Sequence, residues 1–312
     1  MKKRFLIILS ALALLLSGCA QPQSSKKLQV VAAIFPEYDW VRQIVGNDDS
    51  VELTLLVDDG VDPHSFQPAV SDMVTAANCD LLIYGGGESD QWLTKLEATN
   101  PGRETLVLLP LLGAQAHQEE VVEGMEAHEE GEDDAETDEH VWLSLRNASL
   151  FCQAITDALC RLNPAKADTY RGNLAAYQQK LDALDRDYRS AIDASPNRTI
   201  VVCDRFPFRY LVEDYGLSYY AAFPGCSAET GASFETVVFL SDKVKELGLN
   251  ALLVTESSDG RMAKTVAQNA GSADMPVLTL NSMQSVSGEN AKSLDYLTVM
   301  TENLRVLKQA LA

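Results

Sequence analysis

One histidine of the sequence stands in an unusually stiff turn. His64 is one of only four histidines, and Pro63 and Pro68 flank it within residues 61–68 (VDPHSFQP). Proline fixes its own φ angle and restricts the residue before it, so this turn would present the imidazole with little freedom. A metal site needs such a preset donor, whereas the ordinary alternative is a surface turn that happens to contain a histidine. His64 is therefore a candidate metal ligand.

Two further residues have side chains of types that can bind zinc, although their own spacing does not mark them as ligands. His140 lies in residues 138–143 (DEHVWL), where by itself it could simply pack beside Trp142. Cys203 follows an apolar run at 199–202. A thiolate binds zinc at about 2.3 Å and disfavours manganese and magnesium, while a small buried apolar side chain is the alternative for this cysteine.

An acidic segment separates the two candidate histidines. Residues 114–139 lack helical or strand periodicity and contain His117, His128 and about a dozen carboxylates. Because so few apolar residues cannot form a core, we expect this insert to be mobile. It is either a solvated acidic loop or a weak collector of divalent cations, with His117 and His128 binding transiently.

The N-terminus has the anatomy of an export signal. A basic start precedes an apolar run at 5–16, which is shorter than the about 20 residues that span a bilayer. Residues 16–19 (LSGC) resemble a bacterial lipobox, which implies a signal peptide at 1–18 and a lipid on Cys19; an ordinary secretory signal is the alternative. We expect a polar tether at 19–27 and an extracytoplasmic protein anchored to the cell membrane through Cys19.

The spacing of the five cysteines after Cys19 does not indicate a disulfide framework. Their odd number outside the cytoplasm leaves at least one free thiol or metal ligand. Along a predicted helix, Cys152 and Cys160 are roughly 12 Å apart, too far for a disulfide, and the sequence has no CxxC pair. The five are Cys79, Cys152, Cys160, Cys203 and Cys226.

The formal net charge of −20 limits the kinds of partner that the chain can bind. A basic face for nucleic acid or for an anionic membrane surface is disfavoured. We therefore expect no nucleic-acid partner.

Strand and helix patterns alternate along both halves of the chain, which predicts an α/β fold with two doubly wound lobes. The boundaries that we predict are a first lobe at 28–163, a connecting helix region at 164–195 and a second lobe at 196–312. The expected strands are 28–34, 51–57, 80–84, 105–109, 199–202, 219–222, 250–254 and 276–280. The expected helices are 38–45, 71–77 with Ser71 as its N-cap, 147–162, 165–194, 206–215, 234–247 and 294–311. Parallel sheets bind ligands at the carboxyl ends of their strands, and His64 follows such an end.

The His64 turn, the acidic insert and His140-Val-Trp-Leu together resemble the zinc and manganese solute-binding lipoproteins of ABC transporters. This resemblance covers nearly the whole mature chain and implies that a long helix joins the lobes, with the metal cleft between them. It also implies that His64 and His140 are ligands. The chain departs from the family pattern at Glu139, where proline is usual, and at 144–145, where aspartate-proline is usual.

The resemblance makes Cys203 the third ligand, since the family usually has histidine or glutamate in the matching segment. The fourth ligand stays open, because Asn281 replaces the family's usual aspartate. The candidates for it are water, Asn281, Glu256, Glu229 and Cys226.

The expected function is capture of Zn²⁺, as transported cargo, by a monomeric protein that delivers it to a membrane permease. One alternative is manganese or iron cargo on the same scaffold. A different class of protein, a thiol hydrolase with Cys203 as its nucleophile, is a weaker alternative because no nucleophile motif is present. We otherwise expect no enzymatic activity.

Overall fold

The computed structural model describes residues 26–96, 99–126, 137–226 and 231–312. The predicted signal peptide, Cys19, most of the tether, His128 and Glu229 lie outside the described residues. Among the described helices, none is long and apolar enough to cross a membrane.

The first half of the chain forms a four-stranded parallel sheet with the order β2-β1-β3-β4. The strand β3 is completely buried, as expected for a strand with helices and loops on both faces. Its strands are β1 (Leu28–Ala32), β2 (Val51–Leu55), β3 (Leu81–Tyr84) and β4 (Glu104–Val107). The helices around it are α2 (Phe35–Val45), α3 (Val70–Asn78) and α4 (Gln91–Thr94).

The second half repeats this plan with the order β6-β5-β7-β8, again parallel. Its strands are β5 (Thr199–Phe206), β6 (Ser218–Pro224), β7 (Leu252–Val254) and β8 (Val277–Thr279). The helices are α7 (Arg209–Tyr215), α8 (Phe234–Leu247), α9 (Arg261–Asn269), α10 (Gly288–Ala291) and α11 (Tyr296–Ala310). The predicted α/β class with two doubly wound lobes is confirmed.

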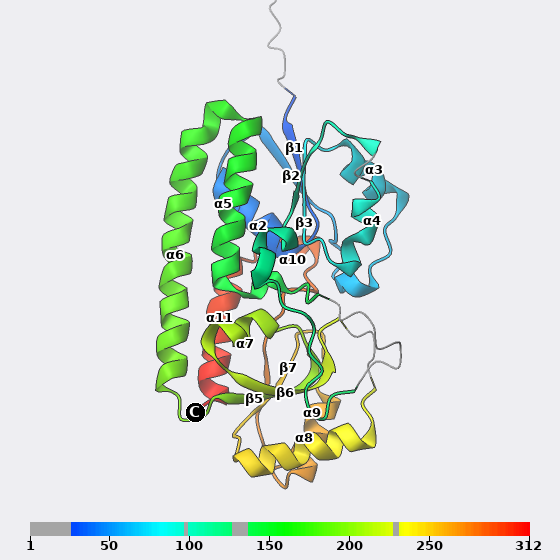
Figure 1. Ribbon diagram of the computed structural model, residues 1–312, viewed down its shortest axis with the longest axis vertical. Coiled ribbons are helices and arrows are strands. Elements are labelled where there is room, and N and C mark those ends of the chain that lie inside the picture. Colours follow the sequence, from blue (N-terminus) through cyan, green and yellow to red (C-terminus); the bar gives the residue numbers. More distant parts are fainter. Residues whose placement is uncertain (1–25, 97–98, 127–136, 227–230) are drawn as a thin grey trace, which may run out of the picture.

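A long helix runs beside both lobes (Figure 1). This helix, α6 (Ala167–Ala194), packs against α5 (Leu145–Leu162), α2 and α11. The Tyr188 hydroxyl donates to the carbonyl of Met300, and the backbone N–H of Tyr296 donates to buried Asp39. The C-terminal helix therefore ties the second lobe back onto α6 and the first lobe.

Two local predictions are wrong. Ser71 does not cap α3, because the helix begins at Val70 with Ala69 at the N-cap. The strand β5 also continues to Phe206, with a register shift between Val202 and Arg205, where a helix was expected to begin. The shift matters for the site, because it decides which side chains at this strand end face the core.

Part of the acidic insert has a fixed place in the structure. We call residues 117–126 the acidic strap. The backbone N–H of Glu126 donates to the carbonyl of Ala222 (2.9 Å), and the Thr236 hydroxyl donates to the carbonyl of Gly124 (3.1 Å). Met125 is buried against the core. The backbone of this part of the insert has hydrogen-bond partners on the second lobe, and the mobility of residues 114–139 stays a prediction. The collector role of His117 and His128 stays a prediction.

Candidate metal site

His64 is carried by a single turn of 3₁₀ helix, Pro63–Ser65, just beyond the carboxyl end of β2. Asp62 caps this turn, since its Oδ1 accepts the backbone N–H of His64 at 3.0 Å. The proline at the first helical position has the φ angle that the turn requires. The imidazole is thus held by a short, stiff and capped turn, as its sequence predicts.

His140 lies in the second loop at this edge of the first lobe and is completely buried. Asp138 contacts both the backbone and the ring of His140. The Oδ1 atom of Asp138 accepts the backbone N–H of His140 at 2.8 Å and lies 2.9 Å from Nδ1 of the imidazole. The Trp142 ring lies edge-on to the imidazole, with centroids 5.3 Å apart. A proton on Nδ1, shared with Asp138, leaves the lone pair of Nε2 free to bind a metal.

The structure brings the two histidines together although 76 residues separate them. Their Nε2 atoms are 3.3 Å apart. Two nitrogen ligands at the usual zinc distance in a tetrahedron are separated by about 3.3 Å. The observed distance therefore fits two imidazoles that face one metal ion.

Cys226 completes a cluster with these histidines. One ligand atom each from His64, His140 and Cys226 lies within 4.8 Å of the others. Gly225 allows this approach, because a Cβ atom there would lie only 2.8 Å from Cε1 of His140 and 2.9 Å from the carbonyl oxygen of Phe206. The third ligand candidate thus comes from the loop that follows β6.

Cys203, the third ligand expected from sequence, is not part of this cluster. Its side chain is 1 % exposed and packs in the core of the second lobe. The neighbouring Asp204 accepts hydrogen bonds from the backbone N–H and the hydroxyl of Thr255 and so links β5 to β7. The chain therefore places at this strand end a core residue and a strand-bridging carboxylate, and the interpretation of Cys203 as a small buried side chain fits the structure.

The candidates for the fourth ligand have other contacts. Both oxygens of Glu256 accept hydrogen bonds from Ser282, and one of them also accepts the backbone N–H of Gln284. Asn281 accepts the backbone N–H of Met283, the one described non-glycine residue with a positive φ (63°). These two side chains hold the loop after β8 in shape.

That loop supplies a residue that the sequence did not point to. The amide nitrogen of Gln284 lies 3.0 Å from Nε2 of His140, the same atom that faces His64. No motif marks a glutamine five residues after a strand, so only the folded loop reveals it.

Burial and charge set the protonation of the cluster. Burial and the nearby His140 lower the pKa of His64, so its imidazole is neutral and ready to bind. Burial acts the same way on His140, but Asp138 outweighs it and raises the pKa of that ring. Burial and the carboxylate of Glu119 raise the pKa of the Cys226 thiol. A metal ion that binds here must displace the thiol proton.

Two α/β lobes that bring imidazole and thiol donors from different lobes together are typical of a two-lobed metal-binding protein. The chain belongs to the family ZnuA, zinc-uptake complex component A periplasmic, whose model matches residues 30–310.

Relatives of known name agree with this membership. The zinc-binding lipoprotein AdcA of Streptococcus pneumoniae is 30 % identical over 319 residues, which cover 99 % of this chain and 61 % of AdcA. The iron ABC transporter substrate-binding lipoprotein MtsA of Streptococcus pyogenes is 28 % identical, with complete coverage of both chains. The chain thus spans about 61 % of the length of the AdcA relatives that it matches.

Solved structures show the same fold. The Zn(II)-bound ZnuA-like domain of Streptococcus pneumoniae AdcA superposes with a TM-score of 0.71 at 27 % identity and covers 91 % of this chain and 99 % of that domain. The metal-dependent lipoprotein YcdH of Bacillus subtilis gives a TM-score of 0.74 at 25 % identity, with 92 % of this chain and all of YcdH covered.

Proposed function

We propose that this protein captures Zn²⁺ outside the cell membrane through His64, His140 and Cys226 and delivers it to the permease of an ABC transporter. The metal is cargo rather than a resident cofactor. Membership in the zinc-uptake family and the donor chemistry of the cluster support this proposal.

The observation that carries the proposal is the 3.3 Å separation of the two Nε2 atoms. Without a metal the same distance allows a hydrogen bond between the two rings, which a bound cation would replace. Asp138 also assigns the proton of His140 to Nδ1, which leaves Nε2 as a lone pair aimed at its partner. Once the proton between the rings is lost, two nitrogen donors stand at this distance, with a thiol beside them and the Gln284 amide 3.0 Å from Nε2 of His140, and a cation can satisfy them.

The thiol favours zinc over the other family cargoes. Thiolate ligands suit zinc, whereas manganese prefers oxygen ligands. The iron-binding name of MtsA makes iron the alternative to be tested. Of the described carboxylates, none joins the two histidines and Cys226 within the 4.8 Å of the cluster.

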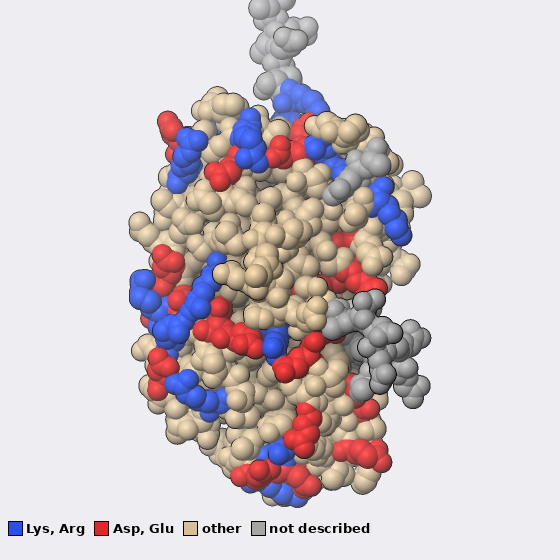
Figure 2. All heavy atoms as spheres, in the orientation of Figure 1, with Lys and Arg blue, Asp and Glu red and all other residues tan. Residues whose placement is uncertain are grey.

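The charge of the protein suits a cation as ligand. The full sequence carries a formal net charge of −20. Figure 2 shows acidic side chains gathered around the middle and over the lower half of one face, where the second lobe lies. Such a surface raises the local concentration of divalent cations and speeds their capture.

The anchor and the partner follow from the same proposal. The lipobox at 16–19 would tether the protein by Cys19 to the outer side of the membrane, next to the permease, and a monomer is sufficient for this role. We propose no catalysis. Burial raises the pKa of the Cys203 thiol, which disfavours the thiolate that a hydrolase needs, and the site cluster does not include it.

The test is a metal-binding measurement on the purified mature chain. Elemental analysis after dialysis should find one zinc per protein, and competition with a chelator should rank zinc above manganese and iron. His64→Ala and His140→Ala should each weaken zinc binding more than about a hundredfold, because each removes a direct ligand. If both variants bind zinc like the wild type, the site is wrong; if iron outcompetes zinc, the cargo is wrong.

A further inference from the structure

Two charged side chains link segments that are far apart in the sequence beside the candidate metal cluster. Arg205, at the end of β5, donates from Nη2 to Oδ2 of Asp62 at 2.6 Å. Glu119, in the acidic strap, accepts the backbone N–H of Cys226 with Oε1 at 2.7 Å. Each contact reaches across from one half of the chain to a segment that carries a ligand of the other half.

The first contact acts on the His64 turn. Asp62 uses one carboxylate oxygen for the backbone N–H of His64 and the other for Arg205. Both partners of the ion pair are mostly buried, with 17 % and 11 % of their side chains exposed. A partly buried, charge-assisted hydrogen bond of this kind is stronger than a surface ion pair. The second lobe thereby fixes the carboxylate that caps the turn of His64.

The second contact acts on the Cys226 loop. The backbone N–H next to the thiol has Glu119 as its acceptor. The strap that carries Glu119 is itself held on the second lobe, by Tyr210 at residue 117 and by Arg209 at Glu120. Gly225 fixes the other side of the same loop, because it packs directly against the His140 ring. The loop is therefore enclosed between the strap and the first-lobe ligand.

We propose that two charged residues position ligands from outside the ligand set: Arg205 of the second lobe sets His64 of the first lobe through Asp62, and Glu119 of the strap sets Cys226. Arg205 and Glu119 are positioning residues and do not touch the metal. The inference rests on the proposed site. Its consequence is that separation of the lobes removes the Arg205 support of His64, so release of the ion is coupled to opening.

The experiment compares Glu119→Ala with Glu126→Ala. Both glutamates belong to the strap and accept a backbone N–H of the second lobe, but Glu126 binds Ser233, away from the cluster. We expect Glu119→Ala to speed zinc dissociation into excess chelator about tenfold, as loss of a ligand's supporting partner does. It should also weaken the thiolate-to-cobalt absorption of the Co²⁺-loaded protein. Glu126→Ala should change neither.

Two conservative variants complete the test. Glu119→Gln keeps an oxygen acceptor and should restore both signals. Arg205→Gln should speed zinc dissociation about tenfold without changing the cobalt absorption, and Arg205→Lys should recover part of the loss, because it keeps the charge but not the planar fork. Thermal unfolding of the metal-free variants shows whether each one is folded.

The outcomes separate this inference from the proposed function. Equal effects of Glu119→Ala and Glu126→Ala, or wild-type dissociation rates in Glu119→Ala and Arg205→Gln, would overturn the inference and leave zinc binding in place. A wild-type chain that binds neither Zn²⁺ nor Co²⁺ would overturn both.

Discussion

The two lobes have sheets of the same order but use the carboxyl ends of their strands differently. In each sheet the first strand of the lobe lies second, between the strands that follow it in the chain. Ligands usually bind where the strand order reverses, which is the space between β1 and β3 in one lobe and between β5 and β7 in the other. The loops that carry His64 and Glu139 close over this position in the first lobe, whereas the second lobe leaves a cavity there.

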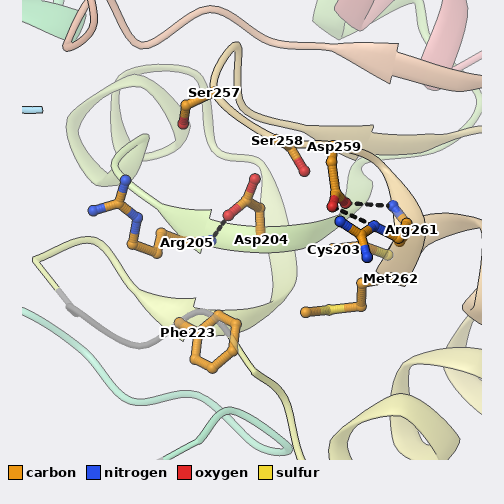
Figure 3. A pocket seen from close by; sticks show the side chains of 9 residues that line it. All are labelled: Cys203, Asp204, Arg205, Phe223, Ser257, Ser258, Asp259, Arg261 and Met262. Atoms are coloured by element: carbon orange, nitrogen blue, oxygen red, sulfur yellow. Dashed lines mark hydrogen bonds and ion pairs between the residues drawn. The ribbon is translucent and has the colours of Figure 1, made fainter. Parts of the chain in front are cut away.

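The two positions differ in how much space their side chains leave open. In the first lobe, residues that include His64, Asp90 and Glu139 close in on a cavity of about 10 Å³. In the second lobe, Cys203, Asp204 and Arg205 line a cavity of about 510 Å³. Figure 3 shows Asp204 between Arg205 and the Asp259–Arg261 ion pair around this cavity.

The difference shows that a shared topology does not assign the ligands. At the end of β5 in the second lobe, Cys203 packs in the core and Asp204 accepts a hydrogen bond from Thr255. The next residue, Arg205, forms an ion pair with Asp62. The candidate ligand of this lobe, Cys226, lies instead in the loop after β6. The repeated fold therefore gives two similar sheets, and the loops at the carboxyl ends of their strands determine which residues become candidate ligands.

The largest expected effect contrasts the two cysteines. Cys226→Ser should weaken zinc binding by more than about a hundredfold, because it removes a thiolate ligand. Cys203→Ser should leave zinc affinity unchanged but lower the free energy of unfolding by about 1–3 kcal/mol, because it buries a hydroxyl in an apolar core. Chelator competition and denaturant unfolding measure the two quantities. Loss of zinc binding in Cys203→Ser alone would reverse our comparison of the lobes.

A smaller effect is expected at Asp90, which lines the nearly closed position between β1 and β3 of the first lobe. Burial raises the pKa of the Asp90 carboxyl to about 7, although it accepts the backbone N–H of Gly86. The folded state therefore binds a proton that the unfolded state has released above about pH 4. This contribution to stability is complete below pH 4 and is lost as the pH rises to about 7.

Asp90→Asn removes this dependence, since the amide keeps an acceptor for Gly86 and has no charge. Relative to the wild type, the metal-free variant should gain about 2–3 kcal/mol in its free energy of unfolding between pH 5 and pH 8. Urea unfolding at the two pH values measures the difference. A constant difference between the two proteins would show that Asp90 is ionised throughout.

Much of the fold could be predicted from sequence because it follows from local patterns. All eight expected strands lie where short apolar runs suggested, and the helix 234–247 is observed with the same ends. The start of α7 was misplaced because residues 206–208 are apolar and fit the core of either a strand or a helix. Here pairing with β6 decided in favour of the strand.

The site could be predicted only in part. His64 has a local signal in its prolines, and His140 was identified by resemblance. From sequence, Cys226 was only one of several candidates for the fourth ligand, because a loop cysteine has no periodicity that shows where it points. Its meeting with His140 depends on contacts between the lobes, through Gly225 and Glu119, that no spacing along the chain encodes.

The smallest effect concerns a support that lies within one lobe. Unlike Cys226, His140 is held by a residue of its own loop, since Asp138 binds both its backbone N–H and its Nδ1. Asp138→Asn keeps an acceptor but loses the charge that strengthens the imidazole as a ligand, so zinc affinity should fall about tenfold. Because the raised pKa of His140 depends on Asp138, that pKa should also fall, and protons should compete less with zinc at acid pH. Zinc affinity measured at pH 6 and pH 8 should therefore differ less in Asp138→Asn than in the wild type. An equal or larger difference would mean that Asp138 does not control the proton of His140, and the contrast between a ligand held by its own loop and one held across the lobes would then lose its basis.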